Sequence, residues 1–319
     1  MTSRLPENIF PIDCHYVREN LAASFLIKGA SDSVIIETGH PGAVTHILSA
    51  LAQHRVDPGS ISHIVVTHVH LDHCGGVGGL IEACPNAKVV CHPRAKLHLS
   101  DPARLIKGSK VVYGEPLFNS LYGNIEPVAK EKIIAVEDTE TIEAAGTTFT
   151  FYHMAGHARH HICIHEAATN TVFTGDTFGV AYPDLQLGNR RFIYPATTPS
   201  DFDIPEARKS IQRLLDLRAD SAWLTHFGNW SGMEEGAEQL LFALAEIEKI
   251  QTDAATDAIE GQALNNFCHE RLKNFVIDEL EKRDLSLTRE QWKVFDYDIK
   301  LNSLGIAYAA DKSRKKLER

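Results

Sequence analysis

The histidine-rich segment Thr67-His68-Val69-His70-Leu71-Asp72-His73-Cys74-Gly75-Gly76 carries the clearest chemical signal in this chain. It follows the β-branched run 61–66, which predicts a buried strand, and its glycines favour a turn into a helix. Because residues two apart on an extended backbone point the same way, His68 and His70 can converge on one point. Asp72 and His73, one turn further on, can face a second point. Single histidines are usually structural, but imidazole and carboxylate groups clustered at a strand end predict a metal site.

Composition sets limits on the class of protein. The chain has 319 residues, of which 44% are hydrophobic and 23% charged, as is ordinary for a soluble globular protein. A net charge of -10 argues against a nucleic-acid surface and gives no attraction to anionic membranes. No apolar run approaches the ~20 residues of a membrane span, and residues 1–6 lack the apolar core of a signal peptide. The six cysteines form no Cys-x-x-Cys pair, so we expect a cytoplasmic protein with reduced thiols.

Strand and helix patterns alternate before a helical end. Strands are expected at 26–28, 34–37, 61–66, 88–91, 132–136, 140–143, 147–152, 162–164, 171–174 and 222–224. Helices are expected at about 41–53, 77–83 and 204–218, and throughout the chain from about 233. Residues 92–127 are less regular and carry Tyr113, Phe118 and Tyr122, in a stretch long enough for a lid or a wall. This order predicts an α+β fold, with two packed sheets in a domain at 8–232 and a helical extension at 233–319.

Three later strands also stop at a residue that could bind a metal. They are Tyr152-His153-Met154-Ala155-Gly156-His157, Phe173-Thr174-Gly175-Asp176 and Leu224-Thr225-His226. Each is ordinary turn chemistry when taken alone. Taken with the histidine-rich segment, however, they resemble the metallo-β-lactamase superfamily, and within it the glyoxalase II-like hydrolases. The resemblance spans roughly residues 20–230.

The resemblance implies a fold and a set of metal ligands. The family fold is a four-layer αββα sandwich with the site at one edge of the two sheets. Matched position by position, the ligands of the first metal are His68, His70 and His157. Those of the second metal are Asp72, His73 and His226. Asp176 matches the carboxylate that bridges both metals, a role that two carboxylate oxygens suit.

The chain departs from the family pattern at several positions. Glu37 stands where the family usually has an Asp that organises the ligands, and its extra methylene moves the carboxylate oxygens. In the motif that begins at Gly156-His157, Arg159 and His160 are particular to this chain. They could touch substrate or be exposed loop residues. Gly179 stands where acyl-homoserine lactonases have a Tyr, which disfavours a lactonase, although Tyr182 could substitute. His70 stands where diiron oxidoreductases have a Glu, which disfavours redox chemistry.

The function that these features predict is a dinuclear metallohydrolase, in which a metal-bridging hydroxide attacks the carbonyl of an ester, thioester or lactone. The resemblance makes a thioester the first choice of substrate. Asp72 could also accept a proton from the metal-bridging water. The cofactors expected are two divalent ions, zinc first, with iron or manganese also suited to nitrogen and oxygen ligands. The expected partner is a small-molecule substrate, without nucleic acid or membrane, and homo-oligomerisation is left open. Two alternatives are an iron-dependent oxidoreductase, of persulfide dioxygenase or diiron type, and a non-catalytic ligand-binding regulator.

Overall fold

The computed structural model describes residues 6–257 and 259–317; residues 1–5, which entered the signal-peptide argument, lie outside this description. The described chain forms two compact units. The first unit contains residues 6–153, 160–175 and 219–231, and the second contains 154–159, 176–218 and the described residues from 232 onward. The predicted domain boundary at 232/233 stays a prediction.

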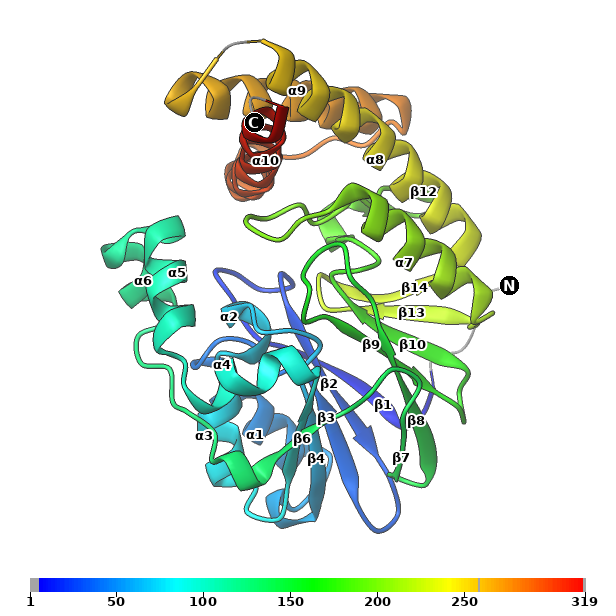
Figure 1. Cartoon of the computed structure of the whole chain (residues 1–319). Coiled ribbons are helices and arrows are strands. Elements are labelled where there is room, and N and C mark those ends of the chain that lie inside the picture. Colours follow the sequence, from blue (N-terminus) through cyan, green and yellow to red (C-terminus); the bar gives the residue numbers. More distant parts are fainter. Residues whose placement is uncertain (1–5, 258, 318–319) are drawn as a thin grey trace. The chain divides into compact units, whose positions relative to one another are not determined.

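The first unit contains two six-stranded sheets, whose strands mostly coincide with the expected segments (Figure 1). The first sheet has the order β1 (Ile9–Asp13), β2 (Ala23–Lys28), β3 (Ser33–Ile36), β4 (Ile61–Val65), β5 (Lys88–Cys91), β6 (Ile133–Ala135). The second has the order β14 (Gly228–Ser231), β13 (Ser221–Leu224), β10 (Thr171–Gly175), β9 (Ile162–Glu166), β8 (Thr147–His153), β7 (Thr141–Ala144). Strands β3 to β6 pair in parallel, as do β10 and β13, and the other neighbours pair antiparallel.

The core of this unit lies between the two sheets. Phe25 of the first sheet packs against Phe173 and Trp223 of the second, with ring centroids 5.2 Å and 5.6 Å apart. Residues that alternate with the core-facing ones, such as Leu26 and Ile35, are also buried. Because side chains alternate between the two faces of a strand, the first sheet is therefore covered on both faces.

Helices of the first unit follow the strands. They are α1 (Ala43–Gln53), α2 (Leu71–Cys74), α3 (Val77–Ala83), α4 (Lys96–Ser100), α5 (Ala103–Tyr113) and α6 (Glu115–Leu121), with short 3-10 turns at Pro58–Ser60, Pro93–Ala95 and Lys130–Lys132. The stretch 92–127, which was expected to be less regular, contains three helices, so that expectation was wrong for much of its length. Pro102, Gly114 and Pro116 divide it into short pieces, and α5 has no buried residue that would give a clear apolar stripe.

The second unit is mainly helical. It contains α7 (Ile204–Asp216), α8 (Met233–Thr256), α9 (Gly261–Lys282) and α10 (Arg289–Leu317), with a 3-10 turn at Pro183–Leu185 and the hairpin β11 (Gln186–Leu187) and β12 (Arg190–Arg191). The chain 194–198 approaches α10 closely, since a Cβ added at Gly305 would lie 1.7 Å from the carbonyl oxygen of Thr197. Helices α8 to α10 confirm the expected helical segment, and the two sheets with their helices confirm the α+β class.

Candidate metal centre

Three predicted ligands meet in the first unit, at the ends of a helix and a strand. Asp72 and His73 lie on α2, and His226 follows β13. The Nε2 atoms of His73 and His226 are 3.3 Å apart, and they lie 3.8 Å and 3.4 Å from Asp72 Oδ2. One ligand atom from each residue lies within 4.8 Å of the others, a grouping that could hold a metal ion. We call Asp72, His73 and His226 the triad.

The outer nitrogen of each triad histidine faces an oxygen atom of the chain. His226 Nδ1 lies 2.6 Å from the carbonyl oxygen of Leu21, and because a carbonyl oxygen only accepts, Nδ1 must donate. In neutral His226 the lone pair is then on Nε2, the atom that faces Asp72 and His73. His73 Nδ1 lies 3.5 Å from Oε2 of Glu37, whose other oxygen, Oε1, accepts from Thr67 N at 3.3 Å. Glu37 is fully buried and has a left-handed backbone (φ 66°), which is uncommon for a residue other than glycine.

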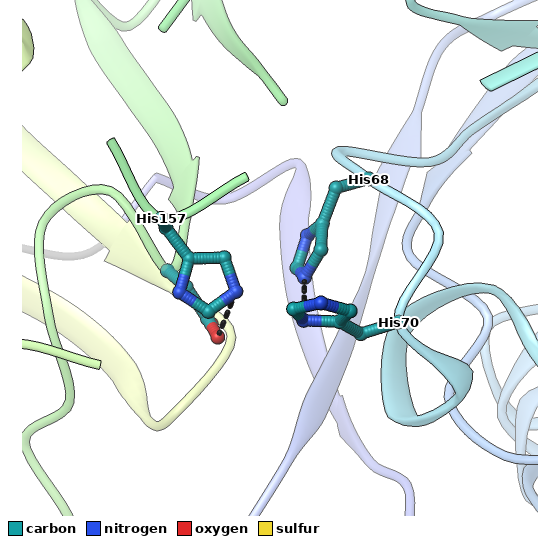
Figure 2. A group of neighbouring side chains, drawn as sticks. His68, His70 and His157 are labelled. Atoms are coloured by element: carbon teal, nitrogen blue, oxygen red, sulfur yellow. Dashed lines mark hydrogen bonds and ion pairs between the residues drawn. The ribbon is translucent and has the colours of Figure 1, made fainter. Parts of the chain in front are cut away.

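His68 and His70 form a second pair in the first unit. His68 Nε2 and His70 Nδ1 are joined by a 2.9 Å hydrogen bond, drawn in Figure 2. His68 is fully buried, and its Nδ1 lies 3.0 Å from the hydroxyl of Thr67. The ring of His68 lies 4.1 Å from that of His73 between centroids, so the pair adjoins the triad. The ring of His161 stacks on His68 at 4.8 Å, which explains a buried histidine at that position.

The other two predicted ligands lie together in the second unit. His157 Nε2 is 3.4 Å from Asp176 Oδ2, and both residues are buried. His157 Nδ1 lies 3.0 Å from the carbonyl oxygen of Ala196, so Nδ1 again donates and Nε2 faces the carboxylate. The arrangement has the same form as at His226, because a backbone carbonyl sets the tautomer of a histidine beside an acid. Whether these seven residues bind metal stays a prediction.

His160, which the sequence analysis left as either a substrate contact or an exposed loop residue, lies beside the His68–His70 pair. The ring of His160 is 6.1 Å from that of His70 and 6.1 Å from that of His98, so His160 is not simply an exposed loop residue. His92 accepts a hydrogen bond from Arg94 N on its Nδ1. Burial, with the positive charge of nearby His153, lowers the pKa of His92 to about 4. No sequence motif marks His92 or His98, because their contacts with His153 and His160 form only through the fold.

The comparisons with known proteins agree with this architecture. A family described as the metallo-β-lactamase superfamily matches residues 17–228. The chain therefore belongs to the metallo-β-lactamase superfamily, whose members typically bind metal ions. None of the helices in residues 6–257 and 259–317 is long and apolar enough to cross a membrane.

Individual relatives are distant. ST1585, a metallo-β-lactamase fold-containing protein of Sulfurisphaera tokodaii, is 27% identical over 210 residues, which cover 64% of this chain and 74% of that protein. An atrochrysone carboxyl ACP thioesterase of Pseudocercospora fijiensis is 26% identical over 154 residues, covering 48% of this chain but only 36% of the thioesterase. The solved structure of metallo-β-lactamase family protein TTHA1429 from Thermus thermophilus superimposes with a TM-score of 0.65 at 18% identity, covering 97% of this chain and 95% of that one. These findings confirm the predicted superfamily and fold.

Proposed function

We propose that this protein is a metal-dependent hydrolase that acts on the carbonyl carbon of an ester, thioester or lactone. The observation that carries the proposal is the triad. Two ring nitrogens and a carboxylate oxygen face one another there, and a backbone carbonyl or a buried carboxylate lies at the outer nitrogen of each ring. Such outer contacts fix the tautomer and orientation of metal-binding histidines. The triad therefore fits a divalent cation.

We propose that two ions are held. Asp72, His73 and His226 would hold one, and His68, His70 and His157 the other, with Asp176 bridging them. His68, His70, His157 and Asp176 each offer one ligand atom of the kind that divalent cations bind. The donors are nitrogen and oxygen only, which suits zinc first and also iron or manganese.

The ions, when bound, would lower the pKa of a water molecule and polarise the substrate carbonyl. The chain's own residues would orient the metal-binding histidines and accept a proton from water. His73 and His226, with their Nδ1 atoms toward Glu37 and Leu21, would present Nε2 and could not rotate without losing those contacts. The side chain of Asp72 is 18% exposed, against 0% for His73, so Asp72 is the triad member best placed to accept a proton from water.

Thioesters are the first substrate class to test, because a relative of this chain is named a thioesterase. A glyoxalase II-like activity would be one form of such a thioesterase. Oxygen esters and lactones require the same attack on a carbonyl carbon and belong in the same panel.

The test begins with protein purified without added metal. Elemental analysis should give about two metal ions per chain, and chelation should lower the melting temperature, because a ligand that binds only the native state stabilises it. The metal-loaded protein should then hydrolyse at least one ester, thioester or lactone, and the chelated protein none. Metal-free protein with unchanged melting would refute the metal site. Iron with oxygen consumption would instead favour an oxidoreductase, and two ions without turnover would favour a regulator.

A further inference from the structure

The peptide bond between Ala196 and Thr197 carries a hydrogen bond on each side. Its carbonyl oxygen accepts from Nδ1 of His157, one of the predicted ligands. Its N–H, which belongs to Thr197, donates to Oδ1 of Asn302 on α10. A peptide unit is planar, so its carbonyl and its N–H cannot turn independently of each other. The orientation of the His157 ring is therefore tied to a side chain of α10.

This arrangement lies out of reach of solvent. The residues that take part are all buried, namely His157, Ala196, Thr197 and Asn302. A buried N–H that loses its acceptor costs free energy, so the bond to Asn302 is not easily replaced. Hydrogen bonds in a chain also polarise one another, and the bond at the N–H strengthens the carbonyl oxygen as an acceptor for His157.

Neighbouring groups decide which way the amide of Asn302 points. Its Nδ2 donates to the carbonyl oxygen of Asp298 at 3.0 Å and to Asp298 Oδ2 at 3.3 Å. The same Oδ2 accepts from the hydroxyl of Tyr194, whose pKa is held well above its usual value by burial and by the charge of Asp298. A flipped amide would turn its NH₂ group toward the N–H of Thr197, which is also a donor. Asp298 therefore keeps Oδ1 of Asn302 directed at the peptide.

Two more features hold this segment on α10. The hydroxyl of Thr197 donates to the backbone carbonyl oxygen of Asn302 at 3.0 Å. One turn further along the helix, Gly305 has no Cβ, and this allows the carbonyl of Thr197 to approach the helix backbone. The chain that supplies the outer partner of His157 is thus packed directly on α10.

We infer that Asn302 is a positioning residue of the metal centre, which holds the Ala196–Thr197 peptide and through it the ring of His157, so that Nε2 is presented to the proposed ion. The inference rests on the proposed function, because the ion is that of the proposed hydrolase. In this scheme Asn302 touches neither the ion nor the substrate. It gives α10 a part in the metal centre, although this helix lies outside residues 17–228, which match the superfamily.

The first measurement is zinc affinity, by competition with a chromophoric chelator. Asn302→Ala removes the acceptor of the Thr197 N–H. Loss of the direct outer partner of a metal-binding histidine lowers metal affinity by about 10–100-fold, and Asn302 acts one bond further out, so we expect a loss of about tenfold at one of the two ions. Thr197→Val is the matched control, because it removes the hydroxyl bond to Asn302 but keeps the N–H. It should lose stability in urea titration without a change in zinc affinity.

The second measurement needs no metal. In the metal-free protein, NMR of the histidine rings follows the Nδ1–H of His157, whose signal is identified by its absence from His157→Gln. Asn302→Ala should shift this signal and speed its exchange with solvent, because the carbonyl acceptor is no longer held. Thr197→Val should leave both unchanged. If Asn302→Ala does not fold, Asn302→Thr replaces it, because the Thr hydroxyl can bond the carbonyl oxygen of Asp298 but is too short to replace Oδ1.

The outcomes separate the inference from the proposed function. Zinc affinity that is unchanged at both ions in Asn302→Ala overturns the inference, as does an unchanged His157 ring signal. An equal loss of affinity in Thr197→Val also overturns it, because weaker packing would then explain the effect. If the wild type binds no zinc, the proposed metal site fails, and the ring signal alone decides whether Asn302 orients His157. Zinc binding without hydrolysis contradicts the hydrolase, and both measurements still decide the role of Asn302.

Discussion

Replacing Glu37 by Gln tests whether a buried carboxylate sets the orientation of His73. The carboxylate is 1% exposed and serves two partners, the Nδ1 of His73 at 3.5 Å and the backbone N–H of Thr67 at 3.3 Å. The two donors face different oxygens of the carboxylate, and a Gln amide has an oxygen at only one of these two places. Its NH₂ group would then face an N–H donor, either on Thr67 or on the His73 ring. The His73 tautomer that presents Nε2 would lose its support.

The expected size of the effect follows from this single lost contact. Removing the outer partner of a metal-binding histidine typically lowers metal affinity by about 10–100-fold. That range corresponds to about 1.4–2.7 kcal/mol. We expect this loss at one of the two proposed ions, the one at the triad. Glu37→Asp keeps the charge but shortens the reach, so it should fall between Gln and the wild type.

Zinc affinity should be measured by competition with a chromophoric chelator. Glu166→Gln is a matched control, because Glu166 is also fully buried and accepts hydrogen bonds from Ala168 N and Thr169 N in the turn after β9. The control should lose stability without a change in zinc affinity. If Glu37→Gln binds two zinc ions as tightly as the wild type, the orienting role of Glu37 is refuted.

Three further predictions use single substitutions. Asp176→Asn should lose one metal and most of the hydrolytic rate while the fold persists, because an anionic bridge offsets repulsion between two cations; His63→Ala should keep both metals, and normal stoichiometry with normal turnover in Asp176→Asn would contradict the bridge. The pKa of His92 is about 4 in the folded protein and 6.5 in the unfolded chain, so unfolding takes up a proton between these values. The free energy of unfolding therefore falls as the pH falls from about 6.5 to 4. His92→Asn keeps an acceptor for the N–H of Arg94, and it should flatten this pH dependence when stability is measured by denaturant titration. An unchanged dependence of stability on pH would contradict the prediction. Gly305→Ala should cost roughly 1–3 kcal/mol, since its Cβ would meet a carbonyl oxygen at 1.7 Å, whereas Gly108→Ala in α5, with nothing within 4 Å, should gain about 0.5–1 kcal/mol; urea unfolding that ranks the two variants otherwise would refute the packing argument.

The sequence predicted most strands because their β-branched residues are concentrated between turn residues. It did not predict β14, whose residues Gly228–Ser231 have weak strand preference and which pairs with β13 through the ladder beyond the His226 turn. It also missed the helices α4 to α6, where short pieces give little periodic signal. Long-range pairing and packing, rather than local preference, form these elements.

The candidate ligands could be predicted because each follows a strand end or opens a helix, which is a local pattern. Their outer partners could not. The contacts to His226 and His157 come from the backbone carbonyls of Leu21 and Ala196, which have no sequence signature. The hydrogen bond between Tyr16 and Tyr122 has no local signature either, because it joins positions 106 apart.

The hydrogen bond between His226 and Leu21 joins positions 205 apart in the sequence, and the His73–His226 contact joins positions 153 apart. Pairings between such distant residues form slowly, because a long loop must close before any contact is gained. During synthesis the His68–His70 pair leaves the ribosome long before His226. We therefore expect the nascent chain to pass through a period in which it can bind a cation with incomplete ligands. Refolding with and without zinc tests this: if early zinc traps the chain, adding it at the start should slow recovery of the native fold, and equal rates would count against such a trap.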